Sequence, residues 1–156
     1  MSKFVTRSLL LLSLFVGAAI LLPKGTQAQA PGPHPGYIHA LEHLRVARAY
    51  LHDNWAWEPV RQDDNYAIAQ IDAAIREIKA AAIDDGKNIG DHPPIDVHAS
   101  WHDRFRHAED LLKMAQSDVA RAEDVPESRG LRDRALQHID AAESAVDHAW
   151  RTARWQ

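Results

Sequence analysis

The spacing of apolar residues between positions 101 and 122 most strongly constrains how this chain can fold. Apolar side chains recur there at alternating intervals of four and three residues: Trp101, Phe105, Ala108, Leu112, Ala115, Val119 and Ala122. This spacing places them along one side of an α-helix, and such a seam packs against other helices at a shallow angle. Residues 37–51, 68–82 and 135–149 carry comparable stripes, and no run alternates between polar and apolar residues as strands do. The sequence therefore predicts an all-α protein with four amphipathic helices.

The second half of the chain repeats the first. A shift of 68 residues superposes Leu44 on Leu112 and Ala67 on Ala135. It also superposes residues 71–74 on residues 139–142, and both segments have the sequence IDAA. Chance identities are common between alanine-rich helices, but a constant offset across a helix, a loop and a second helix indicates a duplication. We expect an up-down-up-down four-helix bundle made of two repeated helical hairpins, in which each hairpin covers the apolar stripe of the other.

The expected boundaries follow from turn and capping residues. Prolines 31, 33 and 35 make residues 29–36 an extended lead-in, so the bundle should occupy residues 37–156. Repeat 1 would cover about 37–86, a linker 87–95, and repeat 2 about 96–154. Asp63, Asp64 or Asn65 could cap the second helix, Asp96 the third, and Pro126 or Ser128 would stand near the start of the fourth.

The first 28 residues have the features of a signal peptide. Lys3 and Arg7 precede an apolar run over residues 9–22, and Ala28 stands at a cleavage position preceded by small residues. An uncleaved anchor is the competing interpretation, but the run is shorter than the roughly 20 residues that span a bilayer. We therefore expect a periplasmic or secreted protein without a stable membrane anchor after cleavage.

The composition excludes several classes of chemistry. The chain has no cysteine, which removes disulfides, thiolate metal sites, covalent haem and cysteine nucleophiles. Loss of the signal segment, with three basic residues and no acid, would lower the formal charge from −4 to −7. Nucleic acid and anionic lipid are poor partners for such a surface. The helices also lack the Glu-x-x-His pattern of di-iron bundles and a convincing haem ligand pair, so no resident cofactor is expected.

Histidine is abundant, with ten residues in the chain. The densest grouping surrounds the middle linker, where His92, His98, His102 and Asp96 could bind zinc, copper(II) or nickel. Helix caps and turns account for many of these acidic side chains equally well. A divalent-metal site is therefore an alternative expectation rather than the main one.

Two other features allow a functional and a structural interpretation. Trp55 and Trp57 fall between the first and second helices, where they could contact a partner protein or close one end of the bundle. The 68-residue shift also places Glu143 where the first repeat has Ile75. That carboxylate is either a perturbed functional acid or a group that reaches solvent or pairs with an arginine.

Some passages resemble a family of small exported bacterial helical proteins without an assigned activity. The resemblance lies in residues 80–88, with the sequence AAAIDDGKN, in the DHPP of residues 91–94, in residues 34–41, and in Leu44, Arg45, Ala47 and Arg48. It implies an exported protein with the same duplicated hairpin. It transfers no functional residue.

No catalytic constellation stands out, because the chain lacks a recognisable nucleophile motif, a glycine-rich phosphate loop and paired catalytic carboxylates. The sequence therefore favours a non-enzymatic exported bundle that acts as a binding or structural module in the cell envelope, through an unknown protein partner or through self-association. One alternative is a periplasmic bundle that binds a divalent metal through surface histidines and acids. Another is an envelope stress chaperone, which would need an exposed apolar concavity.

Overall fold

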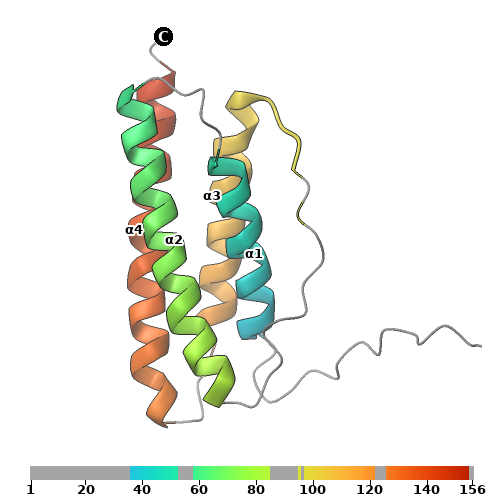
Figure 1. Cartoon of the computed structure of the whole chain (residues 1–156), viewed down its shortest axis with the longest axis vertical. Coiled ribbons are helices and arrows are strands. Elements are labelled where there is room, and N and C mark those ends of the chain that lie inside the picture. The colour runs from blue at the N-terminus through green and yellow to red at the C-terminus, as the bar shows by residue number, and fades with distance from the viewer. Residues whose placement is uncertain (1–35, 53–57, 85–94, 96, 122–125, 155–156) are drawn as a thin grey trace, which may run out of the picture. The chain divides into compact units, whose positions relative to one another are not determined.

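The prediction of an all-α protein with four helices is confirmed. The computed structural model describes residues 36–52, 58–84, 95, 97–121 and 126–154, and no strand occurs among them. The helices are α1 (Gly36–Leu51), α2 (Glu58–Asp84), α3 (Trp101–Val119) and α4 (Arg129–Ala153), and one 3₁₀ turn (Pro126–Ser128) precedes α4. Together the helices form a four-helix bundle (Figure 1).

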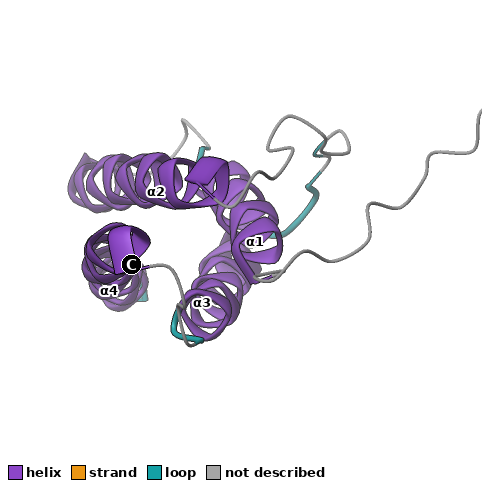
Figure 2. Ribbon diagram, turned by 90° about the horizontal axis from the view of Figure 1, so that it is seen from below, coloured by secondary structure: helices purple, strands orange, loops and turns teal. Residues whose placement is uncertain are grey.

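The helices pair across the two repeats as well as within them. Figure 2 shows α1 beside α3 and α2 beside α4, which are the most extensive packings in the bundle. The ring of Tyr50, near the end of α1, stacks on His107 near the start of α3, with 5.2 Å between ring centroids. Gly36, at the other end of α1, approaches Asp118 near the end of α3. These contacts make α1 and α3 antiparallel.

The order of helix directions differs from the predicted up-down-up-down arrangement, which would make α1 and α3 parallel. As Figure 1 shows, α1 and α4 run in one direction whereas α2 and α3 run in the other. The length of the connection allows this order. An extended chain covers about 3.3 Å per residue, so residues 85–100 suffice to return along a helix of about 30 Å before α3 begins. The bundle is therefore up-down-down-up.

The core repeats with the same offset as the sequence. The predicted stripes of α1 and α4 are buried, and the described members of the α2 and α3 stripes are buried or packed against the core. Buried side chains match buried side chains at the shift of 68 residues: Tyr37 and Phe105, Leu44 and Leu112, Leu51 and Val119, Ile71 and Ile139, and Ile78 and Val146. A single hydrophobic cluster thus draws equivalent residues from both hairpins, and its burial is the main favourable term in folding.

A local twofold axis relates the two hairpins. Gln70 of α2 and His138 of α4 occupy equivalent positions, and the Oε1 atom of Gln70 lies 2.8 Å from Nδ1 of His138. In a twofold arrangement, equivalent residues meet where the axis passes between them. The two hairpins therefore pack as the two subunits of a symmetric dimer would, but within one chain.

Two predicted helix caps are wrong. Helix α2 begins at Glu58, well before Asp63, and Pro59 lies in its first turn, where a missing N–H group costs nothing. Helix α3 begins at Trp101, and Ser100 caps it by accepting a hydrogen bond from the backbone N–H of Asp103 at 3.2 Å. Asp96, the predicted cap, lies outside the described residues. For α4 the prediction is confirmed, because Ser128 stands at its N-cap position.

The close approach of α1 to α3 predicts the effect of adding one methyl group at Gly36. A Cβ atom there would clash with the backbone oxygen of Asp118, which cannot move aside as a flexible side chain would. Despite the better helix propensity of alanine, we expect Gly36→Ala to lower the free energy of unfolding by about 1–3 kcal/mol. The matched control is Gly130→Ala, whose Cβ would meet its nearest atom, Arg134 Nη1, at 3.5 Å. Urea unfolding of the two variants should shift the midpoint in opposite directions, and equal shifts would contradict the prediction.

Candidate functional site

Most of the candidate site residues chosen from the sequence lie outside the described residues. His92, Asp96, Trp55 and Trp57 belong to this group, and the side chain of His102 does too, although its backbone forms part of the first turn of α3. His98 is exposed. Within the described ranges no three His, Asp or Glu side chains gather as a metal site would require. The metal site and the tryptophan contacts therefore stay predictions.

The described histidines do not converge on one another. His148 lies 2.6 Å from Asp63 Oδ2, and His43 lies 3.5 Å from Asp118 Oδ2. His138 contacts Gln70, as described above. Each of these rings therefore meets an acid or an amide of a neighbouring helix, which is an arrangement that joins helices rather than one that chelates an ion.

The twofold relation between the hairpins allows the surface of one to be compared with that of the other. We call the contact of α1 with α2 the first seam and the contact of α3 with α4 the second seam. The first seam comprises Leu41, Arg45, Arg48, Asp72 and Ile75, and the second comprises their equivalents Glu109, Lys113, Gln116, Asp140 and Glu143. The seams can therefore be compared side chain by side chain at positions that the 68-residue shift makes equivalent.

The first seam contains an apolar contact region and the Arg48–Asp72 ion pair. Arg48 donates from Nε to Asp72 Oδ1 at 2.8 Å and from Nη2 to Asp72 Oδ2 at 3.3 Å, which joins α1 to α2. Leu41 is buried in the hydrophobic core, and Ile75 packs against this core. With Arg45, the charged groups of this seam sum to a formal charge of +1. The first seam thus has the composition of an ordinary contact between two helices.

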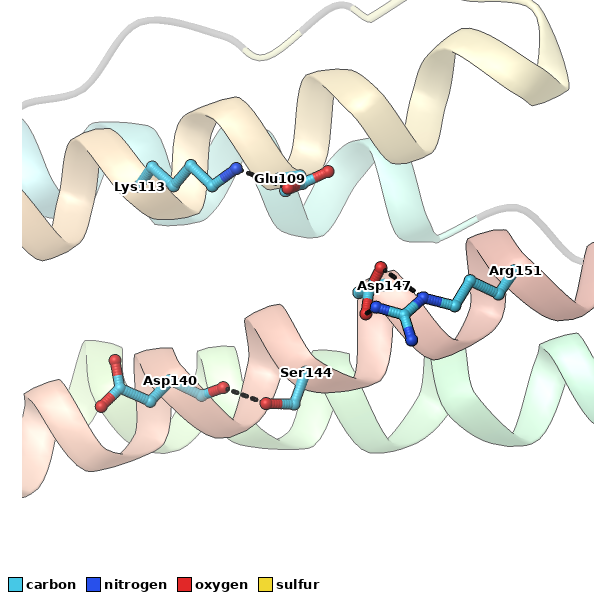
Figure 3. A network of polar contacts seen from close by, with 6 residues as sticks. All are labelled: Glu109, Lys113, Asp140, Ser144, Asp147 and Arg151. Carbon is cyan, nitrogen blue, oxygen red and sulfur yellow. Dashed lines mark hydrogen bonds and ion pairs between the residues drawn. The ribbon is translucent and has the colours of Figure 1, made fainter.

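In the second seam, acids replace Leu41 and Ile75, and an amide replaces Arg48. Figure 3 shows its α3 and α4 faces, with the Nζ atom of Lys113 2.5 Å from Glu109 Oε1 on the same helix. Between the helices, Gln116 Nε2 donates to Asp140 Oδ1 at 2.5 Å, where the first seam has its arginine. With Glu143, the charged groups sum to −2. The hydrogen bond and charge of Glu109 raise the pKa of Lys113, so this lysine stays protonated beside the acids.

Glu143 is the least ordinary residue of the second seam. Its side chain is half-buried, and its Oε1 atom is buried without a hydrogen-bond partner among the described residues. Burial raises the pKa of this carboxyl above its ordinary value of 4.5, and the negative charges of Asp140 and Glu109 add to that effect, while Lys113 opposes it. No described arginine pairs with Glu143, but its side chain is only half-buried and still reaches solvent in part, so both interpretations offered by the sequence stay predictions.

Sequence reasoning missed a buried ion pair between α2 and α3. Arg104 Nη2 lies 2.7 Å from Asp64 Oδ2, and both side chains are only 3% exposed. The guanidinium carbon of Arg104 also lies 4.5 Å from the centroid of the Phe105 ring. A signal was present, because position 104 is three residues after Trp101 and four before Ala108, on the apolar side of the helix. Asp64 was instead assigned to a helix cap.

Together these features define the class of protein: an all-α four-helix bundle of two twofold-related hairpins, with an apolar first seam and an acid-rich second seam. Comparison with protein-family models, curated proteins and solved structures finds no match to this chain. No helix among the described residues has the length and apolar character needed to cross a membrane.

Proposed function

We propose that this chain is an exported, non-enzymatic helical bundle that acts as a binding or structural module in the cell envelope. The proposal rests on one observation: residues from the apolar stripes of all four helices are buried in a single core. A bundle of this kind presents rigid helix surfaces to its surroundings, and function then depends on the polar groups that these surfaces display.

The contrast between the seams indicates which surface to test. The first seam supplies apolar contact and the Arg48–Asp72 pair. The second seam instead holds a half-buried acid at position 143, whose buried Oε1 lacks a hydrogen-bond partner among the described residues, and this choice does not help packing. In engineered and natural proteins alike, residues that weaken local stability without a structural gain are candidates for function.

Export supports the envelope as the place of action. The basic start, the apolar run over residues 9–22 and Ala28 are typical of a cleaved signal peptide. Cell fractionation followed by intact-mass measurement tests this part directly. We expect a chain that begins at Gln29 and occurs in the periplasm or medium, and a full-length chain kept in the cytoplasm would contradict export.

Binding is tested by cross-linking in intact cells with a variant that restores the first-seam residues. Glu109→Leu/Glu143→Ile gives the second seam the side chains of Leu41 and Ile75, and Glu42→Gln on the exposed face of α1 serves as the control. We expect the wild type and the control to give the same cross-linked species, with a partner or with a second copy, and the double variant to lose it. Absence of any such species in the wild type would overturn the module, whereas its retention in the double variant would exclude only the second seam.

A further inference from the structure

Glu143 places an ionisable group where the matching position of the first hairpin is apolar. Ile75, its equivalent on α2, packs against the hydrophobic core. At position 143 the charged form of the side chain loses hydration, and its buried Oε1 gains no hydrogen bond from the described residues in return. A buried carboxylate without such compensation is costly, whereas the neutral acid is much less so.

The charged groups around Glu143 come from both helices of the second seam. Helix α3 contributes Glu109 and Lys113, and α4 itself contributes Asp140 one turn earlier. Helix α2 also packs against α4, but its polar contacts reach Arg134, His138 and His148. At 100° per residue these three positions lie about 140–180° around α4 from position 143. Two acids and one lysine therefore act on Glu143, and the net effect of its neighbours is repulsive to its charge.

We propose that protonation of Glu143 tightens the packing of α3 against α4, so that the second seam is held more firmly in acidic than in neutral solution while the first seam does not respond. If the protein is exported as proposed above, this seam meets the pH of the surroundings. The proposal itself concerns the isolated chain and is tested without reference to location or partner.

The direction of the pH effect follows from the raised pKa of Glu143. In the unfolded chain this carboxyl titrates near 4.5, and in the folded chain it titrates at a higher pH. The folded state therefore binds the proton more tightly than the unfolded state does. The stabilisation is complete below the unfolded pKa and is lost as the pH rises through the folded pKa.

The test compares urea unfolding of the wild type with that of Glu143→Gln, which imitates the protonated acid, between pH 4.5 and pH 8. At pH 8 we expect Glu143→Gln to raise the urea midpoint by roughly 0.5 M, and the difference should shrink as the pH falls. Glu42→Gln, an exposed change with no such burial, should follow the wild type across the range. A wild type and a Glu143→Gln variant with parallel pH profiles would overturn the proposal.

Hydrogen exchange then locates the effect. After correction for the intrinsic pH dependence of exchange, amides of α3 and α4 in the wild type should gain protection on acidification relative to Glu143→Gln, with little change in α1. The comparison uses amides that exchange through local opening, and among these an equal gain in α1 and α3 would contradict a device confined to the second seam.

Discussion

Replacing Arg104 with methionine is expected to lower the free energy of unfolding by about 3–5 kcal/mol. The change keeps much of the side-chain volume but leaves the Asp64 carboxylate, only 3% exposed, without its arginine. Removal of one partner from a buried ion pair costs more than the pair contributes, because the other charge stays in a poorly hydrated site. Urea unfolding followed by circular dichroism at neutral pH measures the loss.

The double variant Asp64→Leu/Arg104→Met separates this cause from a simple loss of packing. With both charges removed, neither member of the pair leaves a buried charge behind, and an apolar pair of similar volume should recover most of the loss. The control is Arg106→Met, whose partner Asp103 is 3.0 Å away on the same helix in an exposed pair. That change should cost less than about 1 kcal/mol. A single Arg104→Met variant as stable as the Arg106→Met control would show that the Asp64 pair does not hold α2 to α3.

The helices and their buried faces were accessible from the sequence because they depend on local periodicity. Residues such as Phe105, Leu112 and Ile139 recur at helical spacing, and each is buried in the structure. The direction of α3 relative to α1 was not accessible in the same way. Both possible directions bury the same stripes, and the choice depends on contacts between distant residues, such as Tyr50 with His107.

The polar residues show the same limit. Asp64 is equally suited to a helix cap and to a buried pair, and only the position of Arg104 on a neighbouring helix decides between the two roles. For the second seam the sequence offered more. The 68-residue offset singled out Glu143 against Ile75, since a duplicated chain contains its own comparison. The offset did not reveal that Glu109 and Lys113 lie close to Glu143, because these two residues belong to another helix.

The substitutions Leu44→Ala and Leu112→Ala test whether the two hairpins share one core. These leucines are equivalent under the 68-residue shift, and neither has any exposed surface. Each truncation removes buried methyl groups and leaves a cavity, so each should lower the free energy of unfolding by about 2–5 kcal/mol. Because α1 and α3 are related by the local twofold axis, the two losses should be similar to within about 1 kcal/mol.

The number of unfolding transitions shows whether the two hairpins share one core. If one core unites the hairpins, circular dichroism and tryptophan fluorescence should report a single transition in both variants, displaced to lower urea by similar amounts. Two hairpins with separate cores would behave otherwise, since Leu44→Ala would weaken only the half that contains α1 and would leave a second transition at the wild-type midpoint. The antiparallel packing of α1 on α3 and of α2 on α4 makes that outcome physically inconsistent with the fold, because neither hairpin can lose its apolar face without exposing the other.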